Sequence, residues 1–402
     1  MAPAPATPED AQATTERGRT AGQGEHWFRG GPGHAGASAA LGPVEEPTQL
    51  WSVDLGAVVF ATPTLVEIDG ALTAFVGTHG GRFVGVAVSG EDAGSVGLDL
   101  DLGGRIWATA ALGEGPTLYV GNDDDTLFAI DPSARGEAAI RWQKRLGNCE
   151  QTRSPGPEGA RCDVDGGPTI GPDGDLFVGA DGVYRLSPAG ELRWHWPPLA
   201  DGQAPEDQRA KHVFSSPVLS ADGRLYFGGQ DGFVTALDAE TGEQRWQYTV
   251  RADVDGSGVI GPDAALYIGA DDGRIYALRP DGSLRWSFVA QRDIRSSLGV
   301  SPDGQLYATS FDGNLYSLAP SGEIEWVLAT GGIIHASPVV DGEGRIYVGS
   351  QDDHLYALSP AGEVLWAVDV GADIDSSVAI APGRTLIVGA DDGQLRAFGP
   401  QN

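Results

Sequence analysis

The feature that most constrains the fold is an internal repeat of 40 residues. Tryptophans mark it at a strict spacing, and they are Trp246, Trp286, Trp326 and Trp366. Between successive tryptophans the same four segments recur: small residues, an apolar segment such as RLYFGG, a third segment such as FVTALD, and the segment that carries the tryptophan. Such a period is typical of solenoids and propellers, because one unit cannot bury its apolar surface without its neighbours.

Each segment has the pattern of a short β-strand. β-branched and aromatic residues alternate with others, and Asp-Gly, Pro-Asp-Gly or Thr-Gly turns separate the segments. The 60 glycines and 26 prolines among 402 residues interrupt the chain too often for long helices. The sequence therefore predicts an all-β protein whose unit is a four-stranded antiparallel sheet.

The number of units predicts an eight-bladed β-propeller. The small-residue strand occurs at Ala61–Pro63, Ala108–Ala110, Gly166–Pro168, Ser215–Pro217, Gly256–Gly258, Ser296–Leu298, Ala336–Pro338 and Ser376–Val378. The last unit ends at Phe398 without a fourth strand, whereas an orphan strand around Trp51 precedes the first unit. We therefore expect the N-terminal strand to close the ring by completing the last blade.

This count also divides the chain. We expect a disordered tail at residues 1–26, a lead-in segment at 27–50 and the propeller at 51–400.

The repeat resembles a known family. TALDAETGEQRW, from Thr235 to Trp246, resembles the A-x-D-x-x-T-G-x-x-x-W signature of the pyrroloquinoline-quinone-type repeat, and YALRPDGSLRW and YSLAPSGEIEW are similar copies. The resemblance spans about Trp27 to Pro400 and implies a propeller in which the tryptophan docks between adjacent blades. Its members include quinone-dependent alcohol and sugar dehydrogenases, with cofactor and metal on the ring axis, and the non-catalytic outer-membrane β-barrel assembly lipoprotein.

Charge and hydropathy exclude some classes of partner. The formal net charge of −30 argues against a nucleic-acid backbone, which requires clustered Lys and Arg. No run of 18 apolar residues is present, so we expect no membrane-spanning helix. The stretch before Trp27 lacks the hydrophobic core of a signal peptide, so we expect either an internal protein or a signal that has been removed.

The redox state of the two cysteines indicates the cellular compartment of the protein. Cys149 and Cys162 lie in one polar insertion, NCEQTRSPGPEGARC, which a disulfide would tie down; two free thiols are the alternative. A disulfide indicates an oxidising compartment, hence a periplasmic or extracellular protein. Free thiols in a full-length chain would indicate the cytoplasm.

Two sequences invite a metal-site interpretation. Asp163-Val164-Asp165-Gly and Asp253-Val254-Asp255-Gly resemble the opening of a calcium loop, but neither supplies the further ligands or the distal Glu. We therefore interpret them as acidic loops, with calcium as the weaker alternative. The acidic clusters Asp123–Asp125, Asp271–Asp272, Asp352–Asp353 and Asp391–Asp392 are interpreted as turn residues at hairpin tips.

One position varies between repeats where its neighbours do not. A β-branched residue precedes each small pair, and it is Val59, Ile106, Val164, Val213, Val254, Ile294, Ile334 or Ile374. The residue after it differs in chemical class, and it is Phe60, Trp107, Asp165, Phe214, Asp255, Arg295, His335 or Asp375. In a propeller this register lies at the mouth of the innermost strand. We expect these eight residues to form a funnel ring that binds a partner; random variation at a wet channel is the alternative.

These observations favour a non-enzymatic scaffold or binding protein over an enzyme. We expect a monomer of the bacterial periplasm or cell surface that recognises a protein or small molecule through the funnel mouth or blade-edge loops, without a resident cofactor. The alternative is a quinone-dependent alcohol or sugar oxidoreductase with a metal on the axis. Against it, the sequence lacks the adjacent Cys-Cys pair typical of the alcohol dehydrogenases, and four repeats are trimmed to 40 residues.

Overall fold

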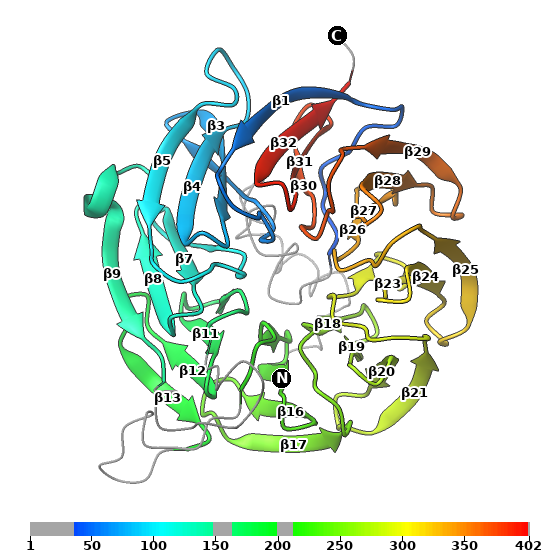
Figure 1. The fold of residues 1–402 in the computed structure, drawn as a ribbon. Coiled ribbons are helices and arrows are strands. Elements are labelled where there is room, and N and C mark those ends of the chain that lie inside the picture. The colour runs from blue at the N-terminus through cyan, green and yellow to red at the C-terminus, as the bar shows by residue number, and fades with distance from the viewer. Residues whose placement is uncertain (1–35, 148–162, 199–211, 401–402) are drawn as a thin grey trace, which may run out of the picture.

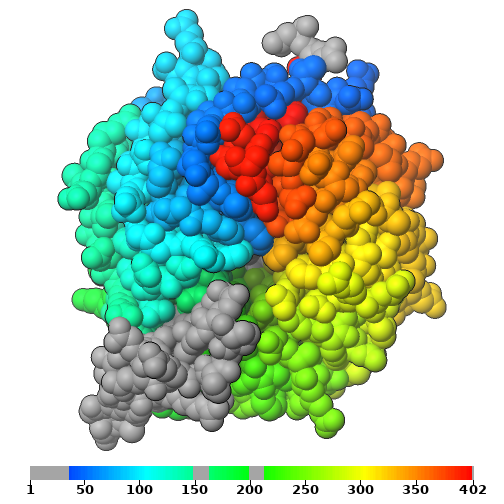
Figure 2. Space-filling model, in the orientation of Figure 1, coloured from blue at the N-terminus to red at the C-terminus, as the bar shows by residue number. Residues whose placement is uncertain are grey.

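The ring architecture is as predicted. In the computed structural model, which describes residues 36–147, 163–198 and 212–400, eight four-stranded antiparallel sheets surround a central axis (Figure 1). The blades pack side by side as successive sectors of the molecule (Figure 2). Within the described ranges no helix has the length and apolarity needed to cross a membrane. The predicted tail at 1–26, the first part of the predicted lead-in, and both cysteines lie outside those ranges.

The strands follow the chain blade by blade. Blade 1 contains β2 (Thr64–Ile68), β3 (Ala71–Gly77), β4 (Arg82–Ala87) and β5 (Val96–Asp101), and blade 2 contains β6 (Ala111–Gly113), β7 (Thr117–Gly121), β8 (Thr126–Ile130) and β9 (Ile140–Arg145). Blade 3 contains β10 (Thr169–Ile170), β11 (Leu176–Gly179), β12 (Val183–Leu186) and β13 (Leu192–Trp196), and blade 4 contains β14 (Val218–Leu219), β15 (Arg224–Gly228), β16 (Phe233–Asp238) and β17 (Gln244–Thr249). Blade 5 contains β18 (Val259–Ile260), β19 (Leu266–Gly269), β20 (Arg274–Leu278) and β21 (Leu284–Val289), and blade 6 contains β22 (Gly299–Val300), β23 (Leu306–Thr309), β24 (Asn314–Leu318) and β25 (Ile324–Ala329). Blade 7 contains β26 (Val339–Val340), β27 (Ile346–Gly349), β28 (His354–Leu358) and β29 (Val364–Asp369), and blade 8 contains β30 (Ala379–Ala381), β31 (Thr385–Gly389), β32 (Gln394–Gly399) and β1 (Thr48–Asp54).

The N-terminal strand closes the ring, as the orphan strand predicted. β1 pairs antiparallel with β32, from Thr48 opposite Gly399 to Asp54 opposite Gln394 (Figure 1). The last blade therefore takes its outermost strand from the other end of the chain, which covers an edge that would otherwise be open to association.

The repeated tryptophan joins each blade to the next. Trp286, on the outermost strand of blade 5, donates a hydrogen bond from Nε1 to the Pro320 carbonyl in a turn of blade 6, at 3.0 Å. A Cβ atom at Gly322 in that turn would lie 2.6 Å from the indole, so the glycine makes room for the ring while adopting a φ of +87°. The same bond joins Trp51 to Val88, Trp142 to Pro188, Trp194 to Ala239, Trp246 to Pro280 and Trp326 to Pro360.

Two junctions depart from this arrangement. Blade 8 has no such turn, because β32 and β1 come from opposite ends of the chain. Trp366 of blade 7 instead donates a hydrogen bond of 3.2 Å to the carbonyl of Pro43, which lies in the segment before β1. Blade 1 carries Leu98 at the tryptophan position, opposite Gly85. There a 3-10 turn, Gly136–Ala139, buries Ala139 in one apolar cluster with Leu98.

Near the axis, the β-branched residue of each repeat wedges between blades. Ile294 is fully buried, and a Cβ atom at Gly269 of the preceding blade would lie 2.3 Å from its Cγ2. Val254 meets Gly228 in the same way, at 2.2 Å. Packing therefore dictates this register and leaves the next residue free to vary.

We expect Gly322→Ala to destabilise the protein more than Gly223→Ala. Both glycines have positive φ, which costs an alanine about 1–2 kcal/mol. A Cβ at Gly223 meets nothing within 4 Å, whereas at Gly322 it displaces the Trp286 ring, adding about 1–3 kcal/mol. Denaturant unfolding of both variants measures the difference, and equal losses would show that the indole does not depend on this turn.

Candidate functional site

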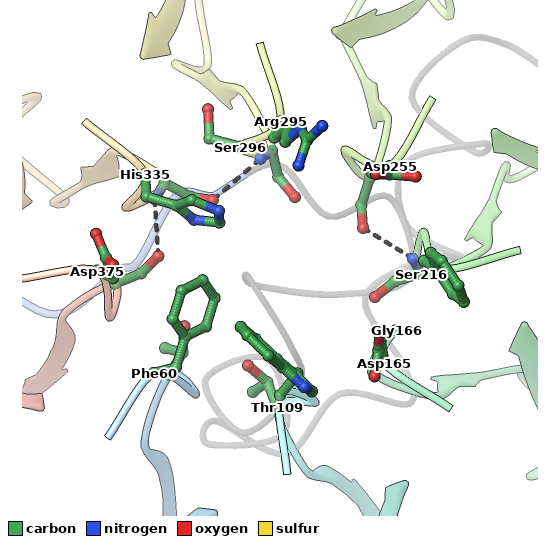
Figure 3. A pocket seen from close by; sticks show the side chains of 18 of the residues that line it. Phe60, Thr109, Asp165, Gly166, Ser216, Asp255, Arg295, Ser296, His335 and Asp375 are labelled. Atoms are coloured by element: carbon green, nitrogen blue, oxygen red, sulfur yellow. Dashed lines mark hydrogen bonds between the residues drawn. The ribbon is translucent and has the colours of Figure 1, made fainter. Parts of the chain in front are cut away.

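The eight predicted ring residues all line one cavity on the axis. Its volume is about 360 Å³, and the lining includes Phe60, Trp107, Asp165, Phe214, Asp255, Arg295, His335 and Asp375 (Figure 3). Much of the remaining wall consists of serines and threonines from the segments just before the innermost strands, and they are Thr62, Thr109, Ser216, Ser257, Ser296, Ser297, Ser337 and Ser377. The geometry thus brings the predicted set together, while its role in binding stays a prediction.

The serines of this wall connect neighbouring blades. The backbone N–H of Ser216 donates to Ser257 Oγ at 2.8 Å, and the N–H of Ser337 donates to Ser377 Oγ at 2.9 Å. Each of these bonds crosses from one blade to the next. These serines therefore help to hold neighbouring blades together at the axis.

Aromatic rings form one side of the cavity. The centroid of the Phe60 ring lies 4.9 Å from Trp107 and 4.6 Å from His335, in both cases edge to face. His79 extends the group, with its ring centroid 3.9 Å from Trp107. Burial lowers the pKa of His79 to about 4, helped by Arg105, and burial with Arg295 does the same for His335. Both imidazoles are therefore neutral at pH 7, so these four rings carry no charge.

Buried carboxyl groups occupy other positions of the ring: Asp255 lies across the cavity from Phe60, whereas Asp375 lies between Phe60 and His335 (Figure 3). Burial, and then the charge of Asp271, raises the pKa of Asp255 to about 6, while Gln230 donates to its Oδ1 at 3.2 Å. Asp375 has the same environment on another blade: burial and Asp391 raise its pKa to about 6. Gln351 donates to both of its oxygens at 3.1 Å. Asp165 and Asp253 add further carboxyl groups to the lining.

Arg295 is the single Lys or Arg among the described residues that line the cavity. Its Nε donates to Asp271 Oδ1 at 3.0 Å and its Nη2 to Oδ2 at 2.5 Å, a bidentate pair. The guanidinium carbon also lies 5.6 Å from the centre of the Phe311 ring. The charge of this arginine is therefore already compensated within the protein.

A second ring of residues supports the first, and sequence reasoning missed it. Each member lies in the turn between the second and third strands of one blade and contacts the funnel residue of the next. The pairs are His79 with Trp107, Gln230 with Asp255, Asp271 with Arg295, Phe311 with His335, and Gln351 with Asp375. This turn position also varies in chemical class from repeat to repeat, and that variation was the available signal.

The turn interpretation of the acidic clusters therefore needs extending. Asp271 and Asp272 do lie in the turn between β19 and β20, as predicted, and Asp272 accepts a hydrogen bond from Tyr276. Asp271 does more than form the turn, because its carboxylate holds Arg295 at the cavity.

The carboxyl groups do not converge as metal ligands. No group of three or more His, Cys, Asp or Glu side chains with metal-binding geometry occurs among the residues that the structure describes, Asp163, Asp165, Asp253 and Asp255 included. Ca²⁺ takes six to eight oxygen ligands. The carboxyl groups of these four residues therefore do not come together as the ligand set of a calcium ion.

The chain matches a known protein family. A family model described as Outer membrane protein assembly factor BamB matches residues 44–253, 179–290 and 271–402. A search of curated protein sequences finds no significant match.

Solved structures share the fold. BamB from Moraxella catarrhalis is 17% identical, with a TM-score of 0.65, over 88% of this chain and 99% of that chain. A europium-containing methanol dehydrogenase is 14% identical, with a TM-score of 0.72, over 93% and 98%. The quinohemoprotein alcohol dehydrogenase from Comamonas testosteroni is 15% identical, with a TM-score of 0.72, over 98% and 85%. At such identities the likeness shows the fold alone.

We expect Asp255→Asn and Asp375→Asn to stabilise the protein at pH 7.5. Each carboxyl group has a folded-state pKa near 6 against an ordinary value of 3.8, so its contribution favours folding below pH 3.8 and is lost as pH rises through 6. The gain in Tm should therefore vanish near pH 4. Scanning calorimetry between pH 4 and 7.5 measures it.

Asp238→Asn is the matched control. Hydrogen bonds from Arg245 and Thr241 lower the pKa of Asp238 to about 2, so its ionised form stabilises the fold above pH 3.8 and this contribution fades as pH falls towards 2. The control should lower Tm at pH 7.5. Cavity variants that behave like this control would contradict the inferred cost of burying Asp255 and Asp375.

Proposed function

We propose that this chain, which belongs to the family described as outer membrane protein assembly factor BamB, is a non-enzymatic binding scaffold. Its binding site is the cavity on the propeller axis. The partner is a protein or a small molecule recognised by the funnel ring.

The observation that carries this proposal is the division between fixed and variable residues at the axis. The β-branched residue of each repeat is buried between blades, whereas the next residue differs in chemistry and lines one shared cavity. A cavity of about 360 Å³ with mixed aromatic and carboxyl walls has the size and composition of a ligand site. Packing does not require such a mixture, so recognition is the function that it supports best.

A quinone-dependent oxidoreductase on the same fold has less support. The fold is shared with two dehydrogenases, but the described residues offer no cluster of metal ligands at the axis. A binding protein that catalyses no reaction requires only the side chains that line the cavity.

We also propose that the protein works as a monomer in the periplasm or at the cell surface. The family description names an outer-membrane assembly factor, which supports the envelope as its location. A Cys149–Cys162 disulfide would agree with an oxidising compartment and remains a prediction.

The test compares two variants of the full chain. Phe60→Ser with Trp107→Ala removes the aromatic side of the cavity, whereas Ile324→Ala with Val327→Ala removes exposed apolar side chains from the outer edge of blade 6. Wild type and both variants are immobilised, incubated with an extract of the native cell envelope, and analysed by mass spectrometry for bound proteins and small molecules.

We expect the cavity variant to lose what the wild type captures and the edge variant to keep it. The free energy of unfolding of the cavity variant should fall by less than that of Trp286→Ala. We expect Trp286→Ala to lose about 3–5 kcal/mol, because it breaks a blade junction. A cavity variant that retains every wild-type partner, or an edge variant that alone loses them, would overturn the funnel as the binding site.

A further inference from the structure

We propose that the cavity on the axis binds an organic cation, an alkylammonium group carried by a small molecule or by a lysine side chain. This inference rests on the proposed function and names the chemistry of its ligand. It follows from the aromatic rings of the cavity, the carboxyl groups beside and across from them, and the pairing of Arg295 with Asp271.

The aromatic side presents a surface suited to a cation. Phe60, Trp107 and His335 come from three different blades, and the centroid of the Phe60 ring lies 4.9 Å from that of Trp107 and 4.6 Å from that of His335. The planes of Trp107 and His335 stand at 71° and 74° to the plane of Phe60, so the three rings do not lie in one plane. Cations are attracted to the faces of aromatic rings, most strongly to tryptophan, and more so where water is excluded.

The charges of the lining also favour a cation. Asp165, Asp253, Asp255 and Asp375 supply carboxyl groups. Arg295 is the one Lys or Arg in the described part of the lining, and its Nε and Nη2 both donate to Asp271. The neighbouring imidazoles are neutral at pH 7. An anion would therefore find no uncompensated positive charge among the described lining residues, and an ammonium group would meet several carboxylates.

The protein already applies the same chemistry to its own cation. The Arg295 guanidinium lies 5.6 Å from the centre of the Phe311 ring while Asp271 binds its edge. Ring face and carboxylate thus hold one cation within the cavity wall. Phe60 and Trp107 offer an equivalent combination, with Asp375 beside Phe60 and Asp255 across the cavity from it (Figure 3). Apart from the paired Arg295, no Lys or Arg is present among the described lining residues.

The test uses a pair of probes that differ only in charge. Choline and its neutral carbon analogue 3,3-dimethylbutan-1-ol have nearly the same shape, and both are titrated into the full chain at pH 7.5 by calorimetry. Cadaverine and Nα-acetyl-lysine amide are the further arms, which separate a free amine from a lysine side chain. We expect at least one of the three cations to bind. If choline binds, it should bind at least tenfold more tightly than its neutral analogue.

Variants locate the binding. Trp107→Leu keeps an apolar side chain but removes the ring face, and Asp375→Asn keeps the shape but removes the charge; each should weaken the cation at least fivefold. Asp281→Asn is the control, because Asp281 lies on an exposed outer turn where it binds Ser283. That variant should bind like the wild type.

Several results would overturn the inference: no binding of any cation at 10 mM, a neutral analogue that binds as tightly as choline, or equal loss in the control. Failure of this kind is distinguishable from failure of the proposed function. If the aromatic cavity variant still loses its native partner while no cation binds, the funnel is a binding site for a ligand of other chemistry.

Discussion

The docking of an indole onto the following blade is the interaction on which the ring depends. One four-stranded sheet leaves both of its faces exposed, so each blade is stable only against its neighbours. Trp286 provides that contact through its stacking on Gly322 and its bond to the Pro320 carbonyl, and the same geometry recurs around the ring. Where the chain ends break the pattern, Pro43 supplies the missing carbonyl to Trp366. Closure therefore takes two pieces of the N-terminal region, the segment around Pro43 as well as β1.

The packing between blades leaves the residue type unrestricted at two positions of each repeat. One is the funnel residue, and the other is the turn residue of the preceding blade that contacts it. The two residues act as a unit: Gln230 donates a hydrogen bond to Asp255, and Asp271 accepts one from Arg295. Changing the chemistry of the cavity therefore requires a change at both positions, because a funnel carboxylate beside Asp271 in place of Arg295 would leave two like charges in contact.

The fold and the funnel ring could be predicted because they follow from the repeat alone. Residues in one register of a propeller must meet at the axis, so a register that varies marks the cavity wall, and all eight members do line it. Contacts between different registers could not be predicted, since they depend on how blades are offset. That is why the sequence indicates only a turn residue at Asp271 and does not pair it with the funnel residue Arg295. The packing of Ala139 against Leu98, in place of a tryptophan, is a contact of the same kind.

The cavity is costly to the fold, and that cost links stability to occupancy. Asp255 and Asp375 are held with their pKa raised to about 6, so each ionised carboxylate is less favourable here than in the unfolded chain. An organic cation between them would compensate that charge and lower both pKa values, and by mass action it would stabilise the folded ring. An anion or a neutral ligand of equal affinity would raise Tm equally but leave these pKa values high. The titration of Asp255 and Asp375 therefore reports the charge of whatever the propeller holds, independently of how tightly it holds it.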